Sequence, residues 1–408
     1  MLLTLIPLFD ENIAVSAYSI FAQKDNMFLN PMGQVTGIYD GATYVQGIEA
    51  VNSMGIETLS GDKMVFVPVS NVSVFSNIEE QCKVAHVKVA ILIDRTVPPV
   101  DTYVKRLKEL KAAGFKIAIR KIAVSEFQVY APILELVDYV FLNNKKIAID
   151  KAKIFFSKLY PNAKLIAGNI DTMETFEALK STGGYQYYEG EFYRIPVTKG
   201  EKEISPAKIT QLELLKIVNN PDFELNDAAD IIGRDTALTL SLLQMVNRVV
   251  KTAEITTIRH AAAMLGQKEL KKWINTAVVN EISSDQPNEI TRLTLLRARF
   301  AENLAGYFDL KMQSEELFLM GLFSVLDVIL DKPMAEALEM IQISKEIKAA
   351  LISHDGKLAP VLDFILAYES ADWSEVSRIL LLGKIDAEKV YEAYIESLGW
   401  YRKTILGV

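Results

Sequence analysis

Residues 225–270 read LNDAADIIGRDTALTLSLLQMVNRVVKTAEITTIRHAAAMLGQKEL, and this stretch decides the fold of the second half of the chain. Apolar residues within 235–249 recur at three- and four-residue spacing and form stripes on two sides of a predicted helix. Asp235 can cap that helix, because its carboxylate can accept a backbone N–H of the first turn. A second helix is predicted over 258–265, where Gly266 suits the left-handed conformation after a helix end. A helix that is apolar on several sides is normally enclosed by others, so the stretch predicts the centre of an all-helical domain.

The same residues resemble the HDOD domain, an all-helical relative of the HD metallohydrolases. The family's run IIxxDxxLTxxLLxxxN is matched over 231–247, and its run I(x)₂I(x)₂A(x)₃LG is matched over 255–266. The resemblance implies fold rather than chemistry, because HDOD domains generally lack the metal ligands of their relatives. The dipeptide His354-Asp355 does not change this expectation. A metal site of the HD type needs several converging His and Asp ligands, and the chain has three histidines.

The composition predicts a globular protein of two domains. A chain of 408 residues is too long for one ordinary core, and half of its residues are hydrophobic. The net charge of −8 argues against general affinity for nucleic acid, whose phosphates need a basic excess. The single Cys82 suits a reducing compartment, and no apolar run approaches the roughly 20 residues of a membrane-spanning helix. Asp10 and Glu11 end the apolar N-terminus too early for a signal peptide, so we expect a cytoplasmic protein with no membrane partner.

Residues 1–197 alternate short apolar strands with helical patterns, which predicts an α/β domain with a mostly parallel sheet, closed as a shortened TIM-like barrel. The polar segment 198–206 is the predicted linker, and 207–408 form the predicted HDOD helical domain with a C-terminal helical extension. The predicted strands are 2–8, 13–21, 64–69, 87–93, 115–119, 139–142, 164–167 and 185–188, with helices that include 100–113, 147–159 and 172–181. The predicted helices of the second half are 207–219, 225–233, 235–249, 258–265, 267–282, 290–308, 313–331, 334–341, 344–353, 358–369, 373–382 and 386–403.

The order of motifs in the first half resembles the EAL domain, a barrel that hydrolyses cyclic di-GMP with two metal ions. The opening run xPLFDxxxxVxAYxxF is matched over 6–21. The family's Gly-Phe-x-x-Ala is matched over 114–118. The family's AEGVE reads AGNID at 167–171, and its QG reads Glu189-Gly190. In the second half, ELFLMGLFSVLD at 316–327 is similar to a run in bacterial proteins that pair a degenerate EAL domain with HDOD. Small residues in that run, Gly321 and Ser324, would permit a close approach of two helices.

The positions that carry the family's chemistry are altered. Ser19 begins the stretch that replaces Glu-Ala-Leu, Asp94 is the one acid left at its strand end, and Arg120-Lys121 replace an Asp-Asp pair. Asp171 and Glu189 are the other acids at strand ends. Two-metal hydrolysis needs several converging carboxylates, and two cations would repel a metal ion. We therefore expect a degenerate barrel with no catalytic residue, metal or cofactor, hence no enzyme. The remnant pocket comprises Ser19, Asp94, Arg120, Lys121, Asp171 and Glu189.

These features predict a bacterial signal-transduction protein that acts through protein–protein contacts in or near cyclic di-GMP signalling. The partner's identity stays open, as does formation of a homodimer. An alternative is a non-hydrolysing receptor for cyclic di-GMP or a related nucleotide, because Arg120 and Lys121 at a strand end could meet phosphates. A solvated basic turn is the simpler interpretation of the same two residues. An active phosphodiesterase or HD hydrolase is the third and least favoured class.

Overall fold

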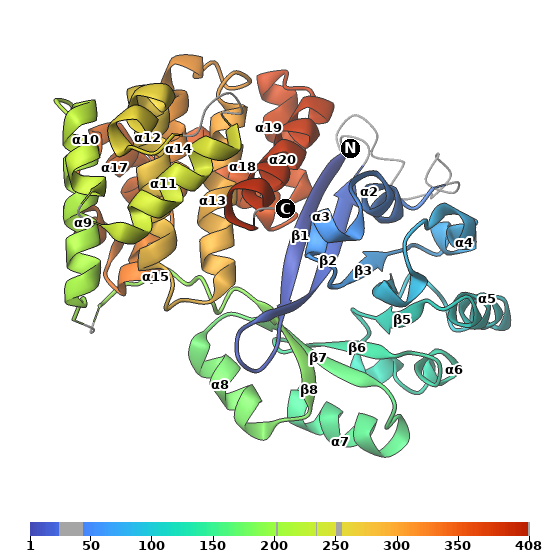
Figure 1. The fold of residues 1–408 in the computed structure, drawn as a ribbon. Helices are drawn as coiled ribbons and strands as arrows, with labels where there is room; N and C mark the ends of the chain where they lie inside the picture. The colour runs from blue at the N-terminus through green and yellow to red at the C-terminus, as the bar shows by residue number, and fades with distance from the viewer. Residues whose placement is uncertain (24–43, 201–202, 234, 250–254, 407–408) are drawn as a thin grey trace. The chain divides into compact units, whose positions relative to one another are not determined.

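The computed structural model describes residues 1–23, 44–200, 203–233, 235–249 and 255–406 of the chain (Figure 1). It divides into two compact units. The first, which we call the barrel unit, comprises Met1–Ile195, Tyr307–Asp309 and Asp363–Val408. The second, which we call the helical unit, comprises Pro196–Gly306 and Leu310–Leu362. No helix in the described parts of the chain has the length and apolarity needed to cross a membrane.

Eight strands close into a barrel in their sequence order, which confirms the predicted architecture. Strand β1 runs antiparallel to both of its neighbours, β2 and β8, and every other neighbouring pair is parallel. The strands are β1 Leu2–Phe9, β2 Val15–Gln23, β3 Met64–Pro68, β4 Val89–Ile93, β5 Lys116–Ile119, β6 Tyr139–Asn143, β7 Lys164–Ile170 and β8 Tyr185–Gly190.

The helices that follow the strands lie outside the barrel (Figure 1). They begin and end within about two residues of the predicted ranges where a prediction was made. They are α2 Gln46–Met54, α3 Ile56–Ser60, α4 Ile78–Gln81, α5 Asp101–Ala112, α6 Ala131–Leu134, α7 Ile149–Leu159 and α8 Met173–Thr182, with short 3₁₀ turns η2 Ser73–Phe75, η3 His86–Lys88 and η4 Val124–Glu126.

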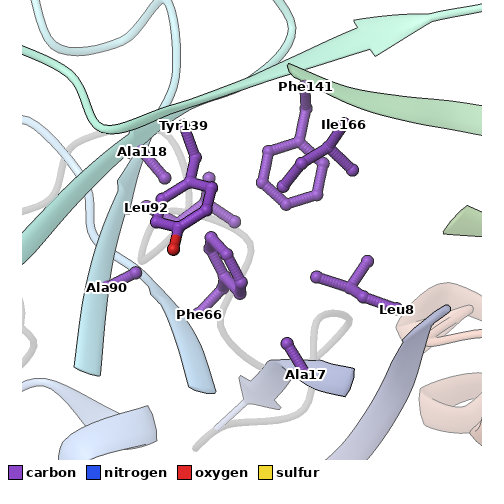
Figure 2. Close-up of a cluster of buried hydrophobic side chains, with 9 residues drawn as sticks. All are labelled: Leu8, Ala17, Phe66, Ala90, Leu92, Ala118, Tyr139, Phe141 and Ile166. Carbon is purple, nitrogen blue, oxygen red and sulfur yellow. The ribbon is translucent and has the colours of Figure 1, made fainter. Parts of the chain in front are cut away.

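The interior of the barrel is filled by side chains that alternate along each strand (Figure 2). Buried members of this cluster are Leu8, Ala17, Phe66, Ala90, Leu92, Ala118, Tyr139, Phe141 and Ile166. Successive side chains of a strand point to opposite faces, so residues two apart share the interior. The pairs on β4 and β6 in this cluster show that spacing directly. The barrel is therefore a packed core up to the level where polar side chains take over.

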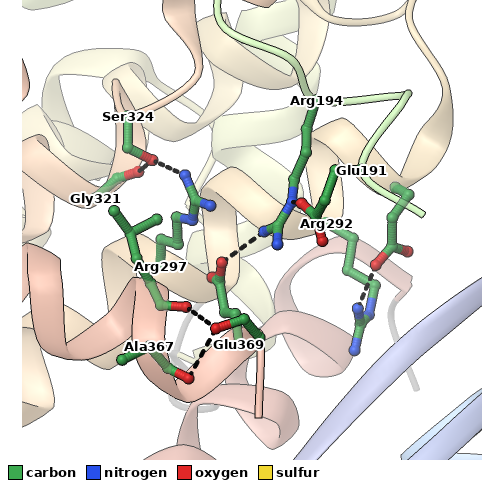
Figure 3. A network of polar contacts seen from close by, with 11 residues as sticks. Glu191, Arg194, Arg292, Arg297, Gly321, Ser324, Ala367 and Glu369 are labelled. Atoms are coloured by element: carbon green, nitrogen blue, oxygen red, sulfur yellow. Dashed lines mark hydrogen bonds and ion pairs between the residues drawn. The ribbon is translucent and has the colours of Figure 1, made fainter. Parts of the chain in front are cut away.

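The C-terminal helices α19 (Trp373–Gly383) and α20 (Ala387–Tyr401) belong to the barrel unit, together with most of α18 (Ala359–Glu369). The sequence analysis assigned them to the helical domain. The difference arises from contacts between distant parts of the chain. The backbone N–H of Leu3 donates to the Tyr368 hydroxyl at 3.1 Å, and Arg194 Nη1 donates to Glu369 Oε2 at 2.7 Å (Figure 3).

The helical unit is built from the helices α9 to α17. Asp235 caps α11 as predicted, since its Oδ1 accepts the N–H of Leu238 at 3.0 Å, and Gly266 kinks α12 with a φ of 76°. Helix 313–331 was predicted as one element, but the chain breaks it at Phe323–Val325. The elements are α9 Pro206–Val218, α10 Leu225–Ile232, α11 Thr236–Val249, α12 Ile258–Ile282, α13 Asn288–Leu304, η5 Lys311–Gln313, α14 Ser314–Leu322, α15 Leu326–Leu330, α16 Met334–Glu339 and α17 Lys345–Ser353.

Gly321 allows α14 to approach α13 closely, as the sequence predicted. A Cβ at this position would lie 2.5 Å from the backbone carbonyl carbon of Arg297, closer than carbon atoms can pack. Ser324 accepts a hydrogen bond from Arg297 Nη1 at 3.0 Å, so the buried guanidinium is tied to the same junction (Figure 3). His354 lies at the end of α17 in the left-handed conformation, which is the position of a helix terminus.

Candidate functional site

Polar side chains replace apolar ones where the barrel strands reach their C-terminal ends. Ser19 lies two residues after Ala17 on β2, Arg120 lies two after Ala118 at the end of β5, and Glu189 follows Tyr187 on β8 with the same spacing. The alternation therefore points all three side chains into the barrel mouth. We call Ser19, Arg120 and Glu189 the rim layer. In barrels of this kind, ligands usually bind at the C-terminal ends of the strands.

Arg120 lies at the centre of the rim layer. Its Nη2 lies 3.4 Å from Glu189 Oε1, and the side chain is only 18% exposed. The guanidinium carbon lies 5.3 Å from the ring centroid of Phe21 and 5.3 Å from that of Phe141, within the range of cation–π attraction. These two rings fix the guanidinium plane.

Four buried atoms of the rim layer lack a hydrogen-bond partner among the described residues. They are Ser19 Oγ, Arg120 Nε, Arg120 Nη1 and Glu189 Oε2. Buried polar atoms without partners are uncommon, because each one loses its bonds to water without replacement. The rim layer thus presents two cationic donors, a hydroxyl and a carboxylate oxygen that a polar ligand could satisfy.

A β-bulge between β7 and β8 fixes the backbone conformation next to Glu189. The pairing of β7 with β8 changes register between Ala167 and Ile170, and Asn169 there has a φ of 60°. A Cβ on Gly190 would lie 2.0 Å from the carbonyl oxygen of Ile170, so this position accepts glycine alone. Bulges of this kind often re-aim a side chain beside a site. Here the bulge directs Glu189 toward Arg120.

The other predicted pocket residues make contacts away from the rim layer. Asp94 Oδ1 accepts hydrogen bonds from the backbone N–H and the hydroxyl of Thr96, which closes its own loop. Asp171 pairs with Lys145 at 2.8 Å with more than half of its side chain exposed. Lys121 is exposed, with a φ of 60°. The structure therefore brings together three of the six predicted residues.

The sequence analysis missed the two aromatic residues of the site. Phe21 and Phe141 were predicted only as members of the strands 13–21 and 139–142, and neither was linked to Arg120. Their inward spacing on β2 and β6 was the available signal. Beneath them, burial raises the pKa of Tyr139 to about 12, with a smaller contribution from Tyr187. The Tyr139 hydroxyl therefore stays protonated and can donate a hydrogen bond.

The rim layer does not fit the pair of metal ions that the EAL resemblance implies. Within the described residues, no three His, Cys, Asp or Glu side chains gather closely enough to hold a metal ion. Glu189 is the one carboxylate in the layer, and its neighbour is a guanidinium. A cation beside Arg120 would be repelled, whereas an anion would be attracted.

Comparison with known proteins identifies the helical part. The model of the family described as HDOD domain matches residues 206–355. These residues form an HDOD domain. The match spans α9 to α17 and the turn after them, and it includes the stretch 231–266 that carries the sequence resemblance.

Two curated proteins align with most of the chain. The cyclic di-GMP phosphodiesterase CdgJ of Vibrio cholerae is 28% identical over 370 residues, which cover 88% of this chain and 84% of that protein. The uncharacterized protein YuxH of Bacillus subtilis is 24% identical over 405 residues, which cover 97% of this chain and 96% of that protein. The chain is thus similar to these proteins across both of its units.

Solved structures of EAL proteins align with about half of the chain. BlrP1 of Klebsiella pneumoniae, in a complex with manganese and cyclic di-GMP, is 14% identical with a TM-score of 0.37, covering 46% of this chain and 54% of that one. An EAL domain protein from Listeria monocytogenes is 14% identical with a TM-score of 0.35, covering 47% and 86%. The barrel architecture of this chain is therefore established by its own strands and their pairing.

The comparison with CdgJ corrects one expectation. The sequence analysis expected that the chain is not an enzyme, because the metal-binding motifs of the EAL resemblance are replaced. A relative aligned with 88% of the chain is named a phosphodiesterase, and this contradicts that expectation. Motif positions judged one by one are a weak guide to activity, since a site is defined by the geometry of all its groups.

Proposed function

We propose that this chain is a regulatory protein of cyclic di-GMP signalling, whose rim layer binds the dinucleotide and whose surface contacts other proteins. The observation that carries the proposal is the buried guanidinium of Arg120 with Nε and Nη1 unpartnered among the described residues. Similarity to a cyclic di-GMP phosphodiesterase over both units supports the choice of ligand.

The chemistry of Arg120 suits a phosphodiester. A guanidinium presents its N–H groups in a planar fork that matches two phosphate oxygens, and such charge-assisted bonds are stronger than neutral ones. The free nitrogens Nε and Nη1 lie on opposite sides of Nη2, so each shares a donor edge of the guanidinium with Nη2, the nitrogen that faces Glu189. The rings of Phe21 and Phe141 hold the plane in place, so little side-chain entropy is lost on binding.

The helical unit supports contact with a protein partner. Several of its buried polar groups are engaged in holding its own helices together. Asn219 Nδ2 donates to Asn275 Oδ1 at 2.7 Å, and Asn275 Nδ2 returns a bond at 3.2 Å. Leu240 and Met264 are each more than half exposed on α11 and α12. The exposed apolar side chains support the proposal that this unit acts through its surface.

Titration calorimetry of the full chain with cyclic di-GMP tests ligand binding. We expect saturable heat from the unaltered protein, at least about a tenfold loss of affinity in Arg120→Ala, and no change in Lys108→Ala. Lys108 is an exposed cation on α5 and serves as the charge-matched control. Hydrolysis is followed chromatographically in the same samples with Mg²⁺ or Mn²⁺. A flat titration with no hydrolysis would overturn the assignment of the ligand.

Affinity capture tests the protein-contact part of the proposal. The full chain and Arg120→Ala are immobilised and exposed to the same cell extract, with and without cyclic di-GMP. We expect a protein whose retention changes with the nucleotide on the unaltered chain and does not change on the variant. Retention that ignores both the nucleotide and the substitution would contradict coupling between the barrel and a partner.

A further inference from the structure

We infer that Glu189 is a built-in competitor for the anion site, which occupies Arg120 until a phosphodiester displaces it. The inference rests on the proposed function, because it concerns the regulation of the same rim layer. In this role, which we call the gate, Glu189 lowers the affinity of Arg120 for the ligand. It neither stabilises the fold through an ion pair nor contacts the ligand.

The Arg120–Glu189 contact is incomplete for a structural pair. One nitrogen and one oxygen approach each other at 3.4 Å, whereas bidentate Arg–carboxylate pairs have two bonds of about 2.7–2.9 Å. Glu189 Oε2 and two nitrogens of Arg120 have no hydrogen-bond partner among the described residues. A buried pair stabilises a fold only when its remaining donors and acceptors are satisfied. This pair is therefore easily exchanged for a better anion.

A phosphodiester and the Glu189 carboxylate are mutually exclusive partners in their present positions. A phosphate bound at Arg120 Nε or at Nη1 would also reach for Nη2, the nitrogen that Glu189 contacts, and would lie a few ångströms from the carboxylate's negative charge. Like charges this close in a poorly solvated site repel strongly. Binding thus requires that Glu189 leave Arg120, and the free energy of its departure is subtracted from the affinity.

The surroundings restrict Glu189 to a side-chain movement. Its backbone is held by the bulge, where Gly190 packs against the backbone of Ile170. Gly168, on the neighbouring strand, faces the carboxylate, and a Cβ there would lie 3.8 Å from Glu189 Oε1. The absence of a side chain at residue 168 leaves room beside the carboxylate. We therefore expect Glu189 to leave Arg120 by rotation about its side-chain bonds, without movement of its backbone.

Calorimetric titration of the full chain with cyclic di-GMP, in the unaltered protein and in Glu189→Gln, tests the inference. The amide keeps the shape of the carboxylate but removes its charge, so we expect about a tenfold tighter dissociation constant. Glu174→Gln is the matched control, since it makes the same chemical change at an exposed position of α8 and should leave affinity unaltered. Products are checked chromatographically in every titration.

Glu189→Asp covers the case in which the amide variant does not fold. Its carboxylate is one methylene shorter and withdraws from Arg120, so its affinity should exceed that of the unaltered chain. Equal or weaker binding in both variants, with normal binding by the unaltered chain, overturns the gate and leaves the proposed function intact. Absence of binding in all three proteins overturns both proposals. Binding by the variants alone would support the competition at Arg120 but overturn the proposed binding of cyclic di-GMP by the unaltered chain.

Discussion

Two arginines of the barrel unit are buried to a similar degree but bonded very differently. Arg106 on α5 is 13% exposed, and its Nη1 and Nη2 donate to the two carboxylate oxygens of Glu79 at 2.6 and 2.7 Å. Its Nε donates to the Val74 carbonyl at 2.9 Å, and Nη2 also reaches the Ser76 carbonyl at 3.0 Å. Arg120 is 18% exposed and, among the described residues, makes a single hydrogen bond, to Glu189 at 3.4 Å.

This difference distinguishes an arginine that stabilises the fold from one that is available to bind a ligand. A guanidinium that holds the fold together uses its donors on neighbouring groups, because each unmade bond in a buried position costs free energy. Arg106 meets that requirement, and so does Arg194, which contacts Glu191 and Glu369 (Figure 3). Arg120 does not, although it is buried. The unfilled donors of Arg120, rather than its burial, mark the rim layer as the place for a ligand.

Removing residues 363–408 should have the largest effect, since it strips the partner from the well-bonded Arg194. The deletion also removes the buried Phe364, Tyr368 and Tyr394, and burial of such a side chain contributes about 1.5–3 kcal/mol. We expect the barrel unit to lose its cooperative unfolding transition in scanning calorimetry. A matched truncation after Lys403, which is exposed, should retain it. If the barrel still unfolded cooperatively without residues 363–408, the assignment of that segment to the barrel unit would be contradicted.

Glu369→Ala should have the next largest effect, because it leaves a buried guanidinium without its best partner. Breaking one side of a buried ion pair costs about 3–5 kcal/mol. Glu191→Ala is the control, since Glu191 contacts the same Arg194 but has more than half of its side chain exposed, and exposed pairs contribute about 0–1 kcal/mol. Denaturant unfolding of the barrel unit measures both. Equal losses would show that burial does not govern these pairs.

Glu79→Gln should destabilise the barrel unit by about 1.5–3 kcal/mol, the range for hydrogen bonds to charged groups. Glu189→Gln should cost less than half as much, because the Arg120 contact is long and single. Unfolding of the two variants at neutral pH gives the comparison directly. A larger loss in Glu189→Gln than in Glu79→Gln would mean that the rim pair is structural.

The Glu79 effect should also depend on pH. The hydrogen bonds from Arg106 lower the pKa of the Glu79 carboxyl from its ordinary value of 4.5 in the folded protein. The folded state therefore binds this proton less readily than the unfolded state. The stabilisation is fully present above pH 4.5 and is lost as the pH falls through the lowered folded value. The difference between the unaltered protein and Glu79→Gln should narrow over that acidic range.

Local sequence patterns predicted the elements well but not their long-range contacts. The cap at Asp235, the kink at Gly266 and the barrel strands follow from residues near one another in the chain. The placement of Tyr368 against Leu3 joins residues 365 positions apart, and no local pattern encodes it.

The candidate site was predicted in part for the same reason. Strand alternation was enough to bring Ser19, Arg120 and Glu189 into one layer. Asp171 forms an ion pair with Lys145, and Asp94 accepts hydrogen bonds from Thr96, so neither joins the rim layer. A charged side chain bonds to the nearest partner that folding brings to it. The contacts of Arg120 with Phe21 and Phe141 come from strands distant in sequence and required the structure.

A crystal structure of the full chain grown with cyclic di-GMP tests the central claim most directly. We predict phosphate oxygens within hydrogen-bond distance of Arg120 Nη2 and of either Nε or Nη1, and the Glu189 carboxylate turned away from Nη2. A dinucleotide bound elsewhere, with the Arg120–Glu189 contact retained, would contradict the assignment of the rim layer as the ligand site.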